Sequence, residues 1–361
     1  MSICNAILAQ FRPVSRCDAG RNAYTKRNHS IDVLKFLCAV FVVFIHTEWK
    51  YKDLLQPIIR CAVPCFLIIS GFFLFDKDGI KPERLKRNLI RLTKITLWAT
   101  LFFIVWKESI AFITKGTLFI PSMKAFANWV LLNENPFAFH LWYLFAYLYT
   151  LLIIKVVNKY NKWKVLYFVT PALLLVDLAF GSYSRLLWDR VPSYFYVRNF
   201  LFVALPYFAI GTMVKRWTNS RDISSYKGMI IGCTILFTIA AYLERNTLVS
   251  LGMFTPREHY LTTTLLSVSM FILALSINNT RKSVLSTLGE KDSLHIYVFH
   301  PVFISCFGLL FGKLQLYETY LYFSSFLVLL ATIVSIKFIR IKKNTTFAHG
   351  FTKSRQKQHT H

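Results

Sequence analysis

Apolar segments of about the length of a membrane span alternate with short polar segments along almost the whole chain. A helix needs about 20 residues to cross the hydrocarbon core of a bilayer, which is roughly 30 Å thick. The pattern therefore predicts an all-α fold, a polytopic transmembrane helical bundle of about ten spans. The predicted windows are 31–47, 57–75, 91–113, 138–156, 165–181, 199–214, 228–243, 260–277, 294–312 and 318–339.

The polar segments between these windows carry most of the lysine and arginine. Because cytoplasmic loops of membrane proteins are enriched in these residues, the charge pattern places 76–90, 155–164, 215–227 and 278–293 in the cytoplasm together with both termini. Residues 1–30 lack a long apolar region followed by a small-residue cleavage site, so we expect a basic cytoplasmic arm there. The predicted domains are this arm, a transmembrane domain at 31–340 and a basic tail at 341–361.

Composition agrees with a chain covered largely by lipid, since 55% of its residues are hydrophobic and 17% are aromatic. The formal net charge of +26 would suggest a nucleic-acid partner in a soluble chain. Here the cations occur in short runs beside apolar spans, so we expect no nucleic-acid partner. The seven cysteines are scattered and show neither a disulfide framework nor zinc spacing, and no metal site is predicted.

The first predicted span contains Asp32, Lys35 and His46, which are costly inside a bilayer and therefore suggest function. At about 100° per residue, His46 returns to within about 20° of the direction of Lys35, and Asp32 lies on the same face. The helical rise places Lys35 and His46 about 16 Å apart, near opposite sides of the membrane. In the alternative interpretation, Lys35 only reaches toward cytoplasmic headgroups and His46 is an interfacial histidine.

Six motifs follow one another from about residue 30 onward, and each is weak by itself. They read Asp32-x2-Lys35-x10-His46; Arg60-x2-Val63-Pro64-x-Phe66-x3-Ser70-Gly71-Phe72-Phe73-Leu74; Arg84-x2-Arg87-x3-Arg91 in a cytoplasmic loop; His140-Leu141-Trp142-Tyr143-Leu144; Arg198-Asn199-x6-Pro206-x-Phe208-x2-Gly211; and Gly289-x3-Ser293-Leu294-x-Ile296-Tyr297-x2-His300. Together, and in this order, they resemble the acyltransferase 3 family of membrane acyltransferases.

The resemblance implies an O-acyltransferase of the plasma (inner) membrane in a bacterial cell envelope. Such proteins move an acyl group, commonly acetyl from cytoplasmic acetyl-CoA, onto carbohydrate or other acceptors destined for the far side of the membrane. The expected acceptor is a surface polysaccharide or a lipid-linked glycan, and the expected surroundings are membrane lipid and polysaccharide biosynthesis proteins. Some members carry an extra C-terminal domain, whereas only a short basic tail follows here, so the expectation is that the membrane domain acts alone or with a separate partner.

Acyl transfer to a hydroxyl needs a base and positive groups that hold the donor and the developing oxyanion. We predict His46 as the general base, with Asp32 pairing with Lys35. Glu48 either orients His46 or faces the outer solvent. The predicted site residues are His46, Glu48 and Asp32 for catalysis; Lys35, Arg84, Arg87 and Arg91 for the phosphates of acetyl-CoA; and Arg60, His140, Arg198 and His300 for the acceptor.

Two alternatives stay open at this point. The loop cations can follow from membrane topology alone, and His140 and His300 can serve packing. A transporter or flippase of a glycan or lipid-linked sugar would also suit ten helices with buried charges, although no matching broken spans are visible in two halves. Neither the acceptor nor the acyl group is fixed by the sequence.

Overall fold

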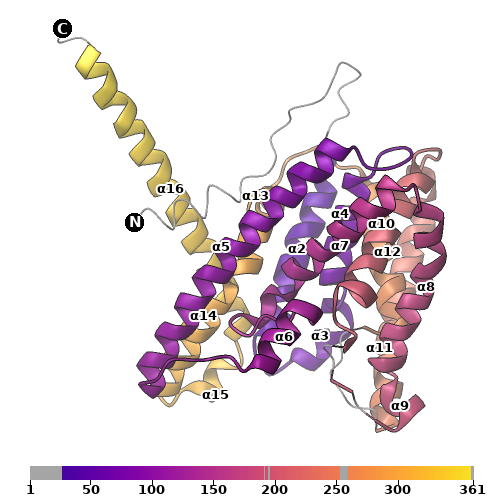
Figure 1. The fold of residues 1–361 in the computed structure, drawn as a ribbon, viewed down its shortest axis with the longest axis horizontal. Helices are drawn as coiled ribbons and strands as arrows, with labels where there is room; N and C mark the ends of the chain where they lie inside the picture. The colour runs from indigo at the N-terminus through magenta and orange to yellow at the C-terminus, as the bar shows by residue number, and fades with distance from the viewer. Residues whose placement is uncertain (1–26, 191, 194–195, 253–258, 359–361) are drawn as a thin grey trace.

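The computed structural model describes residues 27–190, 192–193, 196–252 and 259–358, and regular structure in these ranges is helical throughout (Figure 1). The helices are α2 His29–His46, α3 Lys52–Ile59, α4 Ala62–Leu74, α5 Pro82–Lys115, α6 Met123–Leu132, η1 Phe139–Leu141, α7 Trp142–Lys159, α8 Trp163–Phe180, α9 Ser184–Trp188, η3 Phe200–Ala204, α10 Leu205–Thr218, η4 Ser224–Tyr226, α11 Lys227–Ser250, α12 Leu261–Ile277, α13 Val284–Lys291, α14 Ser293–Lys313, α15 Tyr317–Tyr320 and α16 Ser324–Gln358.

Eight helical segments of the described chain are long and apolar enough to cross a membrane. The predicted all-helical, multi-pass fold is therefore confirmed. Two further windows coincide with shorter helices, the 17-residue α12 and the pair η3 and α10, so the count of ten stays a prediction, as does the orientation. The eight segments are His29–His46, Lys52–Leu74, Pro82–Lys115, Phe139–Lys159, Trp163–Phe180, Ser224–Ser250, Ser293–Lys313 and Ser324–Ile341.

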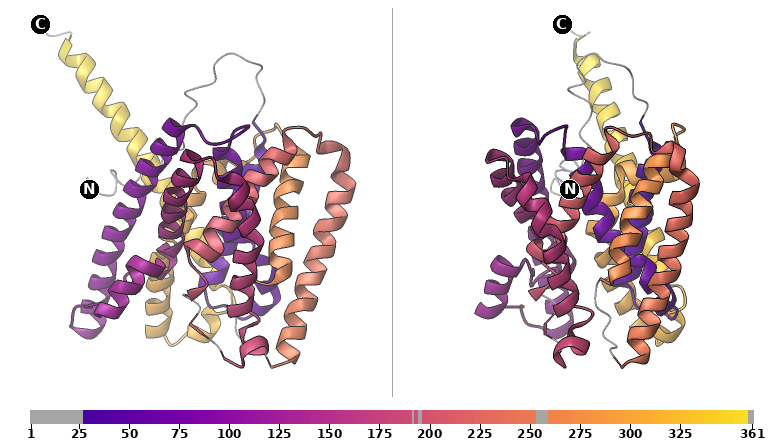
Figure 2. Two further views of the ribbon diagram at one scale, coloured as in Figure 1. Left: turned by 45° about the vertical axis from the view of Figure 1, so that its right-hand side comes forward. Right: turned by 90° about the vertical axis from the view of Figure 1, so that its right-hand side faces the viewer.

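The two predicted terminal segments differ in how far the structure describes them. Of the predicted arm, residues 1–26 fall outside the described residues. The predicted tail is the continuation of α16, which projects away from the other helices (Figures 1 and 2). The helices run up and down between two ends. We call the end with loops 75–81, 160–162 and 219–223 the basic end, and the end with loops 47–51, 116–122 and 133–138 the histidine end.

The centre of the bundle is held by helix crossings at which only glycine fits. A Cβ built on Gly71 of α4 would lie 2.1 Å from the carbonyl oxygen of Phe208 on α10. Gly211 of α10 stands in the same relation, 2.1 Å, to the carbonyl of Ile68. The small-residue site at Gly71 is thus a place where two backbones touch, the usual way in which membrane helices approach closely.

At the basic end, ion pairs tie the first turn of α2 to its neighbours. The side chain of Asp32 is only 2% exposed and accepts hydrogen bonds from Arg27 at 2.7 Å and from Lys35 at 3.2 Å. Arg27 also pairs with Glu290 of α13 at 2.8 Å, and its hydrogen bond with Asp32 raises the pKa of Arg27. The predicted pairing of Asp32 with Lys35 is confirmed, and the buried carboxylate is compensated.

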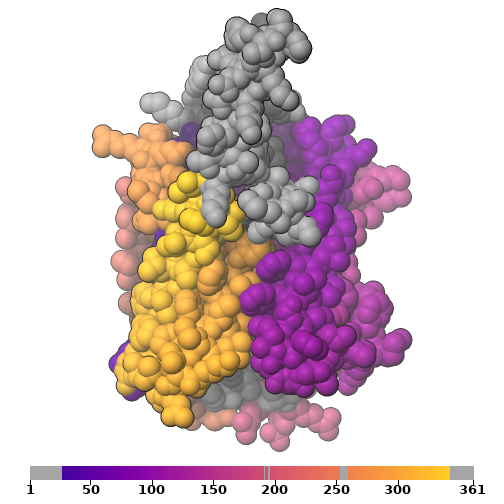
Figure 3. Space-filling model, turned by 90° about the vertical axis from the view of Figure 1, so that its left-hand side faces the viewer, coloured from indigo at the N-terminus to yellow at the C-terminus, as the bar shows by residue number. Residues whose placement is uncertain are grey.

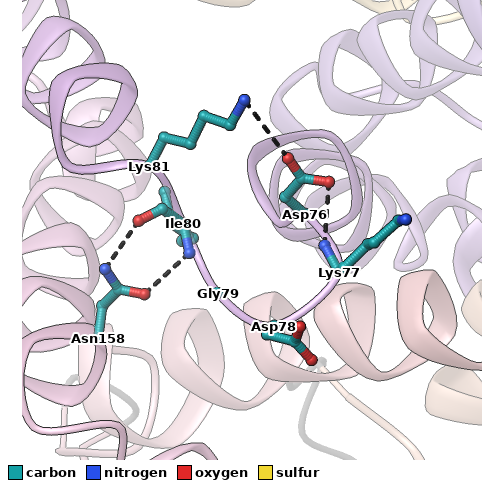
Figure 4. A pocket seen from close by; sticks show the side chains of 7 residues that line it. All are labelled: Asp76, Lys77, Asp78, Gly79, Ile80, Lys81 and Asn158. Atoms are coloured by element: carbon teal, nitrogen blue, oxygen red, sulfur yellow. Dashed lines mark hydrogen bonds and ion pairs between the residues drawn. The ribbon is translucent and has the colours of Figure 1, made fainter.

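The loop between α4 and α5 surrounds a hollow of about 400 Å³ at the basic end (Figure 4). Asn158 of α7 reaches into this loop, where its amide donates to the carbonyl of Ile80 and accepts from its N–H, both at 2.8 Å. The loop therefore has a fixed path into α5. Pro82, which suits the first turn of a helix, starts α5 nine residues before the predicted window. The prediction that Arg84 and Arg87 lie in a loop is wrong, because both residues lie on α5.

Large apolar side chains cover the outside of the bundle, as expected for contact with lipid. Leu101 and Val105 of α5 and Phe168 of α8 are all more than half exposed. One outer face is formed by α5 beside α14 and α16 (Figure 3). Phe102 of α5 meets Phe299 of α14 there, with 5.4 Å between the ring centroids.

Candidate active site

Three histidines from three helices meet toward the histidine end. His46 is the last residue of α2, His140 lies in η1 before α7, and His300 lies in the first half of α14. The ring of His300 is 5.3 Å from that of His46 and 5.5 Å from that of His140, between centroids. The fold therefore brings together the predicted base and two of the predicted acceptor residues, and we call these three side chains the histidine cluster.

His140 is held on both sides. Its Nε2 lies 3.1 Å from the carbonyl oxygen of Val298, and its own carbonyl accepts a hydrogen bond from the hydroxyl of Tyr297. The ring of Phe103 packs edge-on at 4.6 Å. Because Nε2 meets a carbonyl, it must carry the hydrogen, which leaves Nδ1 as the ring acceptor.

His300 has the opposite arrangement of its ring nitrogens. Its Nδ1 lies 2.8 Å from the carbonyl oxygen of Tyr297 and 3.1 Å from that of Ile296, so Nδ1 carries the hydrogen. The residue is completely buried, and its Nε2 has no hydrogen-bond partner within the described part of the chain. His300 therefore presents an unused lone pair inside the cluster.

Arg198 lies beside the cluster because of an unusual local backbone. The side chain of Asn199 accepts hydrogen bonds from the N–H groups of Leu201 and Phe202 and starts η3, a short π-helix of the kind often found at functional sites. The Arg198 guanidinium lies 4.1 Å above the ring of Phe139 and 5.0 Å from that of Trp142.

Arg60 completes the positive surroundings of His46. It lies at the break between α3 and α4, within the segment that the sequence predicts as one continuous second span. Arg60 and Arg198 both interact electrostatically with His46. All four predicted acceptor residues therefore lie around the predicted base.

The two carboxylates predicted to assist His46 lie elsewhere. Asp32 precedes His46 by fourteen residues on α2, about 21 Å along the axis, and belongs to the ion pairs of the basic end. Glu48 follows His46 closely, but its side chain is 71% exposed and pairs with Lys52 at 3.0 Å. Of the two interpretations of Glu48, the structure favours the solvent-facing one.

The predicted donor residues lie at the basic end on two helices. Lys35 of α2 pairs with Asp32, and its ammonium group is 5.6 Å from the ring centre of Phe73. Arg84, Arg87 and Arg91 follow one face of α5, the first two exposed and Arg91 partly buried. The Nε of Arg91 is buried and has no hydrogen-bond partner within the described residues, so this guanidinium retains donor capacity for an anion.

Side chains with hydroxyl groups lie between the basic end and the histidine cluster, and no sequence pattern marks them as a unit. Arg91 interacts electrostatically with Tyr147, and Ser70 lies near the hydroxyls of both Tyr147 and Tyr143, while its own hydroxyl donates to the carbonyl of Phe66 at 2.8 Å. The ring of Tyr143 then meets that of Tyr297 at 5.4 Å. Tyr143 and Tyr297 fall within two of the motifs, but their alignment depends on how α4, α7 and α14 pack.

Polar residues where α8 and α11 reach the histidine end have structural partners. Glu244 accepts hydrogen bonds from the N–H groups of Leu261 at 2.8 Å and Thr262 at 2.9 Å, and so caps α12. Burial and the neighbouring Glu244 raise the pKa of Tyr183, which donates to that carboxylate. Asp177 pairs with His259 at 3.1 Å. We therefore assign these groups to the fold.

No group of three or more histidine, cysteine, aspartate or glutamate side chains in the described ranges is arranged to hold a metal ion. The three histidines of the cluster also have different hydrogen-bonding states, since one ring nitrogen of His140 and one of His300 bind carbonyl oxygens. The geometry suits proton transfer and hydrogen bonding.

Two known proteins are similar in sequence to this chain. A serine/alanine racemase of Enterococcus gallinarum is 24% identical over 352 residues, which cover 90% of this chain and 48% of the relative. An amino-acid racemase of Enterococcus faecalis is 21% identical over 300 residues, covering 77% of this chain and 41% of the relative. The chain thus spans less than half the length of either relative. No solved structure is significantly similar to it.

The comparison with protein families identifies the family of nearly the whole chain. The family described as "Acyltransferase domain" (Acyl_transf_3) matches residues 28–340, which include every helix from α2 to α15 and the membrane-crossing part of α16. All six motifs and the whole histidine cluster fall inside this range. This chain belongs to the acyltransferase 3 family of multi-pass membrane proteins.

Proposed function

We propose that this protein transfers an acyl group, acetyl in the first instance, from cytoplasmic acyl-CoA to a hydroxyl of a cell-surface polysaccharide or lipid-linked glycan. The observation that carries the proposal is the histidine cluster. In this cluster the titratable imidazole of His46 lies near the buried side chains of His140 and His300. Two arginines, Arg60 and Arg198, interact with it, and the whole helical bundle belongs to a membrane acyltransferase family. The protein would act in the plasma membrane of a bacterial cell.

His46 is the proposed general base. It takes the proton of the acceptor hydroxyl as the hydroxyl oxygen bonds to the thioester carbonyl carbon, and it returns that proton to the sulfur when the carbon–sulfur bond breaks. Arg60 and Arg198 supply positive potential for the oxygen that becomes negative during attack. The aromatic rings of Phe139 and Trp142 hold the Arg198 guanidinium in place without neutralising it.

The basic end provides the proposed donor site. Phosphate groups are recognised by arginine through paired hydrogen bonds and by lysine as a point charge. The unused Nε of Arg91 fits an anionic ligand, with Arg84, Arg87 and Lys35 as further cations at the same end. The hydroxyl-bearing side chains of Ser70, Tyr143 and Tyr147 lie between this end and the cluster.

The test uses purified protein in liposomes with radiolabelled acetyl-CoA on the basic side and a glycan acceptor. We expect label on the glycan, and we expect His46→Ala to lower the transfer rate by about 10²-fold or more, because a positioned base contributes 10²–10⁴-fold. Equal amounts of folded protein must be compared. Undiminished transfer by His46→Ala would exclude His46 as the base.

The same assay separates the main alternative. Movement of an unmodified glycan or lipid-linked sugar across the liposome membrane without acetyl-CoA would indicate a transporter or flippase. One relative is named a serine/alanine racemase, so free serine, which has a hydroxyl group, is a second acceptor to be supplied in parallel. Label on serine alone would replace the glycan as the proposed substrate and leave the acyl transfer intact.

A further inference from the structure

A histidine that acts as a base uses one ring nitrogen for the proton and needs its other nitrogen held by an acceptor. The held nitrogen fixes the tautomer and the orientation of the ring. Neither predicted carboxylate can hold the second nitrogen of His46. Asp32 is paired at the basic end, and the side chain of Glu48 is exposed to solvent. The partner of His46 must therefore come from another part of the fold.

His300 offers an acceptor of the required kind. Both of its Nδ1 contacts run to carbonyl oxygens of its own helix, at Ile296 and Tyr297, so the lone pair on Nε2 lies on the opposite side of the ring, away from the α14 backbone. That atom is buried and unpartnered within the described residues. The nearest described ring centroid is that of His46, at 5.3 Å, on α2, which packs against α14.

We infer that His300 is the positioning residue of His46, with its Nε2 accepting a hydrogen bond from the imidazole of His46. This inference rests on the proposed acyl transfer. The bond leaves the other nitrogen of His46 free to take the hydroxyl proton, and it stabilises the imidazolium formed during attack. No covalent bond changes at His300, whose own hydrogen stays on Nδ1.

His140 is the less suitable partner. Its Nε2 meets the carbonyl of Val298, and among the described residues the rings in contact with His46 are those of His300 at 5.3 Å and Phe139 at 6.5 Å. The ring of His140 also contacts the ring of His300 and so helps to keep the His300 ring in place. The cluster therefore contains one base, one acceptor that orients it and one side chain that supports the acceptor.

Two substitutions at His300 separate positioning from a structural role. His300→Gln places an amide near the position of Nε2 and can restore the acceptor. His300→Asn places its amide near the position of Nδ1, where it can donate to the carbonyls of Ile296 and Tyr297 but cannot reach His46. Positioning predicts that kcat falls about 10²-fold in the Asn variant and much less in the Gln variant, with an unchanged KM for the acyl donor.

A purely structural role predicts the reverse order. If anchoring to the α14 carbonyls were the only task of His300, the Asn variant would match the wild type, while the Gln variant would lose abundance and melting temperature. That order, or equal kcat in both variants, overturns the inference. Both variants are normalised to folded protein measured by size-exclusion chromatography in detergent.

His295 provides the matched control. It is also buried on α14, and its Nδ1 lies 3.1 Å from the carbonyl of Lys291, four residues earlier. The same pair of substitutions at His295 should show no advantage of Gln over Asn in kcat. Acyl transfer by the wild type is measured first. If the proposed function is wrong, the wild type shows no transfer. If only the positioning role is wrong, the wild type is active and the His300 variants show the other order of kcat.

Discussion

At the scale of single residues, what each histidine of the cluster can do depends on which of its ring nitrogens already contacts a backbone carbonyl. His46, His140, His300, Arg60 and Arg198 were all candidates, and the fold gathers them. Their hydrogen-bonding states could not be predicted, because each depends on a carbonyl that another turn or another helix supplies. Glu48 is the clearest example, since its sequence position beside His46 suggested contact and its side chain turns to solvent.

Glu48 gives a prediction at this scale. An exposed ion pair such as Glu48 with Lys52 contributes little, about 0–1 kcal/mol, and the carboxylate stands apart from the cluster. We expect Glu48→Gln to keep the rate of acyl transfer within about twofold of the wild type. The liposome assay measures this beside His46→Ala. A tenfold or greater loss in Glu48→Gln would return Glu48 to the catalytic residues.

At the scale of elements, the positions of the helices follow from hydrophobic length, but their ends and crossings do not. The start of α5 at Pro82 and the break at Arg60 lie where hydropathy changes little, so windows based on hydropathy missed both. The short π-helix η3 is set by the side chain of Asn199 and by Asn133, which accepts from the N–H of Phe200. The bonds of Asn199 are local and that of Asn133 is tertiary, and none of them leaves a periodic signal.

The crossing of α4 and α10 gives the prediction for this scale. Because a Cβ at Gly211 would meet the backbone carbonyl of Ile68 at 2.1 Å, no side chain can rotate away and the two helices must separate. We expect Gly211→Ala to destabilise the protein by about 1–3 kcal/mol and lower its melting temperature. Activity should fall as well, since α4 follows Arg60 and α10 follows Arg198.

A matched glycine is available as the control for that substitution. Gly232 lies within α11, and a Cβ built on it meets nothing within 4 Å. Gly232→Ala should leave the melting temperature unchanged or raise it slightly, because alanine favours the helix over glycine by about 1 kcal/mol. Equal effects of the two substitutions would show that the α4–α10 crossing tolerates separation.

At the scale of the whole molecule, the structure places the cations proposed to bind the donor and the histidine cluster at different depths of one bundle. The charge pattern predicts that the basic end faces the cytoplasm, since its loops carry the lysine and arginine runs. The proposed transfer needs the same orientation, because its acyl-CoA donor would come from the cytoplasm and its acceptor would be on the far side. The orientation is therefore a prediction that both the charge pattern and the proposed function make.

The orientation of the protein in the membrane can be measured by labelling single cysteines placed in exposed loops. Thr117→Cys lies at the histidine end and Ser220→Cys at the basic end, and both positions are exposed. A membrane-impermeant thiol reagent added to intact cells should label Thr117→Cys above the background of the unsubstituted chain, whereas Ser220→Cys should react only after permeabilisation. The reverse result would place the cluster on the cytoplasmic side. His46 could then act only on an acceptor that had not yet crossed the membrane, so the proposed transfer would not cross the membrane.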